Sequence, residues 1–484
     1  MSESARTPST LVSFLPIAIL VAMLAFTIKI FGGDALGGGS QISLLVTSAS
    51  CVIIGMAFYK VPWQSFENAI TKNIAGVSSA IIILLIIGAL SGTWMVSGIV
   101  PTLIYYGMQI IHPSFFLVST CLICVLISVM TGSSWTTIAT IGIALLGIGK
   151  AQGFDEGWIA GAIISGAYFG DKVSPLSDTT ILASSVTGTP LFRHIRYMMF
   201  TTVPSLVLAL IIFTVMGLSG GTRDAAHIEE FASCLDERFC ISPWLLIVPV
   251  LTGVLIAKKV PSIMTLAIST AMACVAAAIF QPHLLQEIAE GGGLFKGIMM
   301  SCYGETSIQT GNPVLTELVA TRGMAGMMDT VWLILCAMCF GGTMTAGGML
   351  RSITSAFVSF VRGRVSLVAS TVCSGLFLNL ATADQYISII LTGKMFSRIY
   401  EKSGYESRLL SRTTEDAVTV TSVLIPWNTC GMTQATILGV PTLAYLPYCF
   451  FNIFSPIMSI LIAAIGYKIV KKNPDEIQVQ NQAV

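Results

Sequence analysis

Charged residues are scarce in this sequence. Asp, Glu, Lys and Arg make up 10% of its 484 residues, whereas soluble domains contain about 25%. The mean hydropathy is +0.83, and 54% of the residues are hydrophobic. This composition excludes a soluble globular domain. The net charge of +1 comes without a basic patch, so no nucleic-acid partner is expected.

Histidine is also scarce, and the cysteines are mostly surrounded by apolar residues. The four histidines share no ligand spacing and are predicted in loops or at interfaces: His112, His194, His227 and His283. Most of the 12 cysteines lie in apolar runs, where Cys behaves as a small hydrophobe. Cys234 and Cys240 lie in a charged loop and could form a disulfide if that loop is extracytoplasmic. We expect no metal site other than one for Na⁺, no catalytic residues and no cofactor.

Long apolar runs fill the sequence instead. They recur from residues 11–31 to residues 446–467, and many approach the length of a membrane-spanning helix, which is about 20 residues. The polar start has no small-residue cleavage site, so the first span is predicted to remain in the protein. The sequence therefore predicts an all-α polytopic membrane protein.

Glycine and proline positions indicate an internal repeat. At a shift of 251 residues, four pairs coincide: Gly153/Gly404, Pro175/Pro426, Gly188/Gly439 and Pro190/Pro441. At a shift of 250, three more do: Gly92/Gly342, Thr93/Thr343 and Gly98/Gly348. Because glycine and proline control backbone geometry, we interpret the coincidences as a duplication. Chance matches in a glycine-rich chain are the alternative.

Loop charges test the relative orientation of the two repeats. In the first, residues 59–72 and 188–196 are basic, whereas 32–41 and 149–158 are not. In the second repeat the signs exchange: the basic loops are 257–262 and 393–412, and 439–448 has no charge. Under the positive-inside rule, the repeats have opposite topology and both termini are cytoplasmic. Inverted repeats of this kind are typical of secondary transporters.

Each repeat is expected to contain about five transmembrane helices, a re-entrant hairpin and a broken helix. The first covers residues 1–220, with its hairpin at 114–150 and its broken helix at 158–187. An extracytoplasmic loop (221–242) leads to the second repeat (243–470), with a hairpin at 365–400 and a broken helix at 409–438. Residues 471–484 form a cytoplasmic tail. Ordinary pairs of full spans would give the same hydropathy as the hairpins.

Polar residues concentrate at the hairpin tips and the helix breaks. Pro175 and Pro426 break the two helices, and lipid tolerates a broken helix only where it is buried or lines a watery cavity. We therefore expect one polar chamber near mid-membrane. Its predicted wall consists of Ser133, Ser134, Trp135, Thr136, Ser174, Pro175, Thr382, Pro426, Trp427, Asn428 and Thr429. The two tryptophans either contact a substrate or fill space.

Buried carboxylates are the candidates for cation and proton binding. Asp178 has no adjacent cation and is the first choice. Burial favours the protonated carboxyl and a bound cation favours the ionised one, so a single Asp can exchange H⁺ for Na⁺. Ser177 and Thr179 would supply further oxygen ligands. Asp384, in the place of Ser133, is the second choice.

Four other charged positions have competing interpretations. Asp171 is either a third binding carboxylate or the partner of Lys172 in a salt bridge. Glu415 and Asp416, beside Arg412, are predicted to be a solvated helix cap. Glu305 lies in an outer segment, 281–323, and is a gate, part of an interfacial helix or part of an exposed loop.

The stretch "GAYFGDKVSPLSDTT" at residues 166–180 closely resembles the signature of the bacterial NhaC-type Na⁺/H⁺ antiporters. "GETS" (304–307) and "IPWNTCG" (425–431) extend the resemblance over most of the chain. It implies Na⁺/H⁺ exchange across the bacterial cytoplasmic membrane, a homodimer and elevator-like alternating access. Some relatives couple these ions to malate and lactate, amino acids or amines, so an organic substrate is the alternative. A channel and an enzyme remain as competing classes, but no nucleophile, base or metal constellation supports an enzyme.

Overall fold

The computed structural model describes residues 8–31, 38–219, 225–469 and 471. These residues form helices joined by short turns, and contain only isolated bridges in place of strands. Within them, nine helices are long and apolar enough to cross a membrane, or up to eleven if each sharply bent pair is one span. The prediction of an all-α, multi-pass membrane protein is confirmed.

The first part of the chain begins with three long helices and a short one. These are α1 (Thr10–Phe31), α2 (Gly39–Tyr59), α3 (Trp63–Val96) and α4 (Ile99–Ile110). The pair predicted as a hairpin follows as α5 (Phe116–Thr131), α6 (Ser134–Thr137), the π-helical turn η3 (Ile138–Gly142) and α7 (Ile143–Ala151). The predicted broken helix consists of α8 (Glu156–Val173) and α9 (Asp178–Val186), and α10 (Leu191–Ser219) completes this part.

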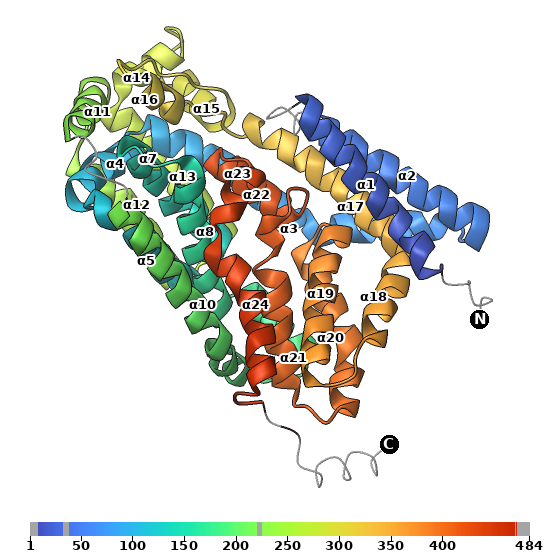
Figure 1. Cartoon of the computed structure of the whole chain (residues 1–484). Helices are drawn as coiled ribbons and strands as arrows, with labels where there is room; N and C mark the ends of the chain where they lie inside the picture. The colour runs from blue at the N-terminus through green and yellow to red at the C-terminus, as the bar shows by residue number, and fades with distance from the viewer. Residues whose placement is uncertain (1–7, 32–37, 220–224, 470, 472–484) are drawn as a thin grey trace.

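The second part repeats this order with an added outer segment. It begins with α11 (Ala225–Arg238), α12 (Ile247–Ala257) and α13 (Ser262–Phe280), followed by the outer helices α14 (Pro282–Ile288), α15 (Leu294–Tyr303) and α16 (Pro313–Val319). Then come α17 (Met328–Ala346), α18 (Met349–Ser359), α19 (Arg364–Thr382) and α20 (Gln385–Lys402). The second break lies between α21 (Ser407–Thr414), with its π-helical turn η6 (Glu415–Thr419), and α22 (Thr429–Leu438). The chain ends through α23 (Thr442–Tyr445) and α24 (Phe450–Ile465) (Figure 1).

Matching turns in the two parts have the same backbone conformation. Three of the four glycine pairs that coincide in sequence have a left-handed φ: Gly98 and Gly348 (82° and 71°), Gly153 and Gly404 (both 74°), and Gly188 and Gly439 (65° and 66°). The fourth pair, Gly92 and Gly342, lies inside the helices α3 and α17. Only glycine adopts the left-handed conformation without strain. The glycines of the three left-handed pairs, which were paired by sequence position, therefore also have matching backbone conformations.

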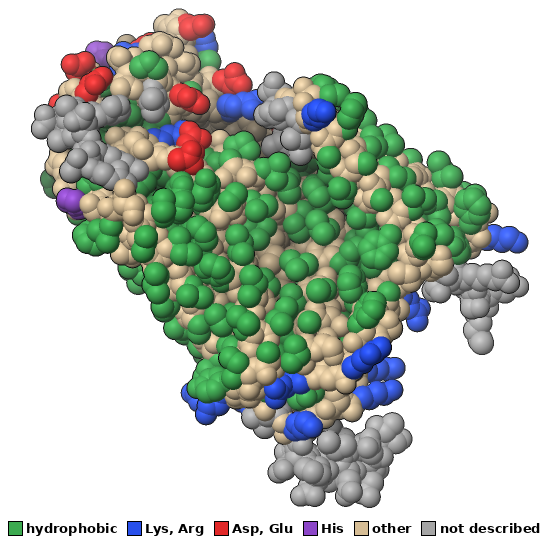
Figure 2. Space-filling view, viewed as in Figure 1, with side chains coloured by type: hydrophobic (Ala, Val, Ile, Leu, Met, Phe, Trp, Pro, Cys, Tyr) green, Lys and Arg blue, Asp and Glu red, His purple; other side chains and the backbone are tan. Residues whose placement is uncertain are grey.

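The acidic side chains gather at one end of the molecule. Figure 2 shows Asp and Glu, with some Lys and Arg among them, at the end that contains α11, α14 and α16. At the opposite end it shows Lys and Arg, and apolar side chains cover the surface between. Many of these apolar side chains are exposed, including Phe26, Ile53, Leu126 and Ile211 at 53–66%. This surface is suited to hydrocarbon.

The close packing of α5 on α8 depends on glycines. A Cβ on Gly166 would overlap the carbonyl oxygen of Cys121, whereas a Cβ on Gly253 in α12 would meet nothing within 4 Å. We expect Gly166→Ala to cost about 1–3 kcal/mol through overpacking, and Gly253→Ala to be neutral or slightly stabilising. Thermal unfolding of the purified variants measures both, and equal destabilisation would contradict this packing argument.

The structure corrects two predicted details and describes two that the sequence left open. His194, expected in a loop or at an interface, is fully buried on α10. The segment expected as a loop at 221–242 contains the helix α11, and residues 221–224 lie outside the described part, as do 472–484 of the expected tail. Cys234 and Cys240 are both free thiols. Glu305 forms an exposed ion pair with Arg322 (3.1 Å).

Candidate functional site

A cavity of about 570 Å³ lies where both helix pairs and both helix breaks meet α3. Three carboxylates line it: Asp171 from α8, Asp178 from α9 and Asp384 from the start of α20. They come from separate elements, so only the tertiary structure brings them to one space.

The two turns between paired helices, which we call the tips, have the same hydrogen-bond pattern. In the first, Thr131 Oγ1 accepts from the Ser133 N–H (3.1 Å) and lies 3.2 Å from Thr137 Oγ1. In the second, Thr382 Oγ1 accepts from the Asp384 N–H (3.2 Å) and lies 2.8 Å from Ser388 Oγ. Each tip therefore positions a capping side chain at the start of its second helix, Ser133 in one and Asp384 in the other.

Each tip is also bonded to the break in the following helix. In the first part, the Ser174 hydroxyl donates to the carbonyl of Val129 (2.8 Å). In the second, Trp427 Nε1 donates to the carbonyl of Leu380 (2.9 Å). In each part, the hydrogen bond joins the polar tip to the polar break. Trp427 thus has a structural hydrogen bond and is not in the cavity wall.

Asparagines satisfy carbonyls freed by the second break. Asn379 Nδ2 donates to Val418 O (2.7 Å), and Asn452 Nδ2 donates to Val420 O (2.7 Å). Asn428 caps α22 through the Cys430 N–H (3.1 Å) and donates to Asn379 O (3.1 Å). A break in the membrane is stable only with such partners. Asn428 therefore supports the site from behind the wall.

Asp171 is buried and held by three donors. Its Oδ2 accepts from the Ser134 N–H (3.1 Å) and hydroxyl (2.7 Å), and its Oδ1 accepts from the Ser177 hydroxyl (2.6 Å). Of the two interpretations of Asp171, the salt bridge to Lys172 is wrong, because Lys172 forms its ion pair with Asp416 instead.

Asp178 is exposed to the cavity. It begins α9 directly after the capping Ser177, and we find no hydrogen bond or ion pair to its carboxylate among the described residues. The positive end of a helix dipole favours a negative charge at this position. Of the three carboxylates, Asp178 is thus the one whose oxygens are free to take a cation from the cavity.

Asp384 belongs to the second tip and caps the start of α20. It is 2% exposed; its Oδ1 accepts from the Ile387 N–H (2.8 Å), and its Oδ2 receives a long bond from the Thr429 hydroxyl (3.4 Å). Oδ1 of Asp384 therefore caps the helix, and Oδ2 has only a weak hydrogen bond. Thr429 lines the same cavity.

The remaining predicted residues divide into wall and support. Those in the wall, besides the carboxylates, are Ser133, Trp135, Thr136, Thr179 and Thr429. Ser134, Ser174, Ser177, Thr382, Pro175 and Pro426 belong to the tips and breaks but not to the wall. The wall also contains residues that were not predicted for it, among them Gly76, Val77, Ser79, Ala80 and Ile83 of α3 and, on α20, Gln385 and Tyr386. The last two follow Asp384 directly, which was the available signal.

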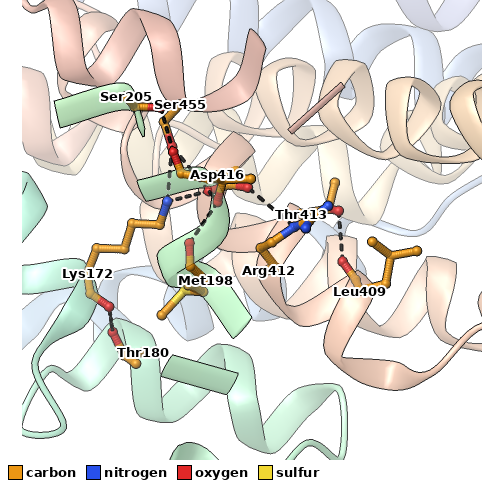
Figure 3. Close-up of polar contacts among 10 residues, drawn as sticks. Lys172, Thr180, Met198, Ser205, Leu409, Arg412, Thr413, Asp416 and Ser455 are labelled. Atoms are coloured by element: carbon orange, nitrogen blue, oxygen red, sulfur yellow. Dashed lines mark hydrogen bonds and ion pairs between the residues drawn. The ribbon is translucent and has the colours of Figure 1, made fainter. Parts of the chain in front are cut away.

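A second group of charges is fully buried beside the cavity (Figure 3). Lys172 of α8 forms an ion pair with Asp416 of η6, and the Thr201 and Ser455 hydroxyls donate to the same carboxylate oxygen (3.0 and 3.1 Å). Arg412 approaches the other oxygen of Asp416 (3.9 Å). The prediction that Asp416 is a solvated cap is therefore wrong, because it is the counter-ion that makes two buried cations tolerable.

Glu415 is also buried, which corrects the same prediction. Neither of its carboxyl oxygens has a hydrogen-bond partner, and among the described residues no cation lies within ion-pair distance. A charge at this position would lack direct compensation, so we expect the neutral acid. Glu415 and Asp416 are thus adjacent in sequence but differ in electrostatic role.

Comparison with known proteins supports the resemblance seen in the sequence. Residues 166–467 match the model of the Na⁺/H⁺ antiporter family. The chain is 38% identical to the Na⁺/H⁺ antiporter NhaC of Alkalihalophilus pseudofirmus, over 87% of this chain and 90% of that protein. It is 36% identical to the malate-2H⁺/Na⁺-lactate antiporter of Bacillus subtilis (88% and 89% covered) and 33% identical to the arginine/ornithine antiporter ArcD of Halobacterium salinarum (97% and 95%). These relatives are named as transporters, and the chain belongs to the Na⁺/H⁺ antiporter family, with NhaC-type antiporters among its relatives.

Proposed function

We propose that this protein is a secondary transporter that exchanges Na⁺ for H⁺ by competition at Asp178. The observation that supports this most directly is the single cavity lined by Asp178, Asp171 and Asp384. The name of the relative NhaC, a Na⁺/H⁺ antiporter, agrees with these two ions. Asp178 releases its proton when Na⁺ binds, and Thr179 with the opened backbone supplies further hard oxygen ligands, which suit Na⁺.

The other two carboxylates have supporting roles in this proposal. Asp171 is held by Ser134 and Ser177 and adds negative potential beside Asp178. Asp384, with Thr429, offers oxygens from the second repeat. A cation entering the cavity then meets ligands from both repeats, so movement of either repeat changes the site.

We further propose the inverted-repeat architecture, in the bacterial cytoplasmic membrane with both termini cytoplasmic. The shared left-handed turns and the shared tip hydrogen bonds support the repeat. The basic end of the molecule supports the orientation (Figure 2). The homodimer and the elevator-like movement are proposed from the family resemblance alone.

Two cavities support alternating access. A second one of about 590 Å³ lies along the outer parts of α3 and α17 and is lined by Met432 and Thr436 of α22. Thr429, at the start of α22, lines the first cavity. Thr429 and Met432 are three residues apart, which is about 4.5 Å along a helix. The two cavities therefore share the helix α22, and a movement of this helix would change the lining of both.

Sealed vesicles containing the purified protein test the exchange. An imposed Na⁺ gradient is expected to move protons in the opposite direction, with saturation by Na⁺ and reversal when the gradient is reversed. Flux that rises without saturation would support a channel, and absence of proton movement with any alkali cation would reject the proposed exchange.

A coupled organic substrate is the second candidate. The relatives named for malate and lactate and for arginine and ornithine support it, as does the cavity of about 570 Å³, which is in the range of small-molecule sites. We expect a true substrate to raise the thermal unfolding midpoint of the purified protein, more so with Na⁺ than with K⁺. Carboxylates, amino acids and amines form the test panel. If none stabilises the protein or competes with Na⁺, the plain ion exchanger remains.

A further inference from the structure

A basic pocket of about 550 Å³ lies at the basic end of the molecule, separate from the ion cavity. It is formed by the start of α10, the start of α21 and the turn after α24. Its wall contains four cationic and three aromatic residues and no carboxylate: Arg193, Arg196, Arg408, Lys468, Phe192, Tyr197 and Phe200. We propose that this pocket binds the phosphate headgroup of an anionic phospholipid from the inner leaflet.

The charge of the pocket is only partly compensated. Glu406 pairs with Arg193 (2.8 Å) and Arg408 (2.7 Å). Arg196 and Lys468 are exposed and have no ion-pair partner among the described residues. Arg193 and Arg408 share one carboxylate, and the other two cations have none. The pocket therefore has an excess of positive charge, which suits a phosphate diester.

An apolar stripe continues from the pocket along α10. Phe192, Arg196 and Phe200 are spaced by four residues, so they lie on one helix face. The same face continues with exposed apolar residues: Val203, Val207, Ile211 and Val215, at 40–55% exposure. Acyl chains lying on this stripe bring the attached headgroup to the cations. This continuity favours a lipid over a free anion.

Aromatic rings give the pocket a fixed shape. Phe200 packs edge-on against Tyr197 (5.9 Å between ring centroids) and against Tyr467 (5.6 Å). Tyr467 is 52% exposed, and amphipathic rings of this kind are typical of the headgroup level. The pocket is therefore built at the depth at which a headgroup lies.

The pocket is connected to the buried charges. The guanidinium of Arg408 lies over the Tyr197 ring at 4.9 Å, and that of Arg412 lies over the same ring at 4.8 Å. Arg412 in turn faces Asp416, the counter-ion of Lys172. A bound headgroup thus fixes the ring that supports the inner ion-pair group, and lipid binding is expected to stabilise the folded protein.

The test compares lipid binding by two double variants of the full chain. Arg196→Gln/Lys468→Gln removes the two free cations and leaves the Glu406 pairs intact. Lys394→Gln/Arg398→Gln, on α20, removes two exposed cations that are not in the pocket. Each protein is placed in nanodiscs of phosphatidylcholine with or without phosphatidylglycerol. Retained phosphatidylglycerol is counted by native mass spectrometry, and the thermal midpoint is measured in parallel.

We expect the pocket variant to bind phosphatidylglycerol about 10- to 30-fold more weakly than the wild type, and to lose its lipid-dependent stabilisation. The Lys394/Arg398 variant should remain within about twofold. Equal loss in both variants would mean unspecific surface attraction and would overturn the proposal. Stabilisation by inorganic phosphate equal to that by the lipid would assign the pocket to a soluble anion instead. No preference of the wild type for phosphatidylglycerol would also overturn it.

Discussion

Asp178→Asn is expected to abolish Na⁺-driven proton movement in sealed vesicles while the protein still folds. The side chain faces the cavity without a protein partner, so the substitution leaves no buried donor unsatisfied. The amide keeps the shape but can neither release a proton nor balance the charge of Na⁺. Loss of a charged ligand is worth about 3 kcal/mol, or about 100-fold in affinity.

The matched control is Asp236→Asn, because Asp236 is an exposed carboxylate on α11 outside the cavity. It should exchange ions like the wild type. The measurements are proton movement after a Na⁺ pulse and Na⁺ binding to the purified protein. Undiminished exchange by Asp178→Asn would remove Asp178 from its proposed role and leave Asp171 and Asp384 as the candidates.

The adjacent carboxyls Glu415 and Asp416 are expected to differ sharply when neutralised. Asp416→Asn leaves the buried Lys172 without its counter-ion, and breaking a buried pair by removing one partner costs about 3–5 kcal/mol. Glu415→Gln replaces a group that we expect to be a neutral acid with a neutral amide of the same shape. Its cost should be below about 1 kcal/mol.

Thermal and denaturant unfolding of the two variants in one detergent measures this difference. The double variant Lys172→Met/Asp416→Asn is the control, because it removes both partners and should recover part of the stability lost in Asp416→Asn. If Glu415→Gln and Asp416→Asn are equally destabilised, the assignment of the charge to Asp416 and the neutral acid to Glu415 is wrong.

Two adjacent residues of α8, Asp171 and Lys172, contact different parts of the protein. Asp171 lines the ion cavity, whereas Lys172 points to Asp416 (Figure 3). Neighbouring residues of a helix are about 100° apart around its axis. Adjacent opposite charges in a helix therefore point in different directions. Their adjacency in the sequence suggests a salt bridge between them, although each has another partner in the structure.

The sequence by itself determined the class, the helical segments and the places where helices break. Those features depend on local properties: hydropathy over a span length, and proline or glycine at a turn. Residues 113–151 and 156–186 form the helix pair and the broken helix close to the predicted 114–150 and 158–187. The family was also recognisable, because residues 166–180 form one continuous stretch.

Only the tertiary structure decided which polar residues meet. Asp171, Asp178 and Asp384 line one cavity, whereas Trp427 and Asn428, predicted for the same wall, bond to carbonyls behind it. Asp416 is a buried counter-ion because the fold brings it to Lys172, which is 244 residues away in the chain. Both α8 and η6 pack against α24. Which charges pair over such a sequence distance depends on how whole helices pack. An unpaired buried charge is costly, but this cost can favour a particular pair only after the helices have packed.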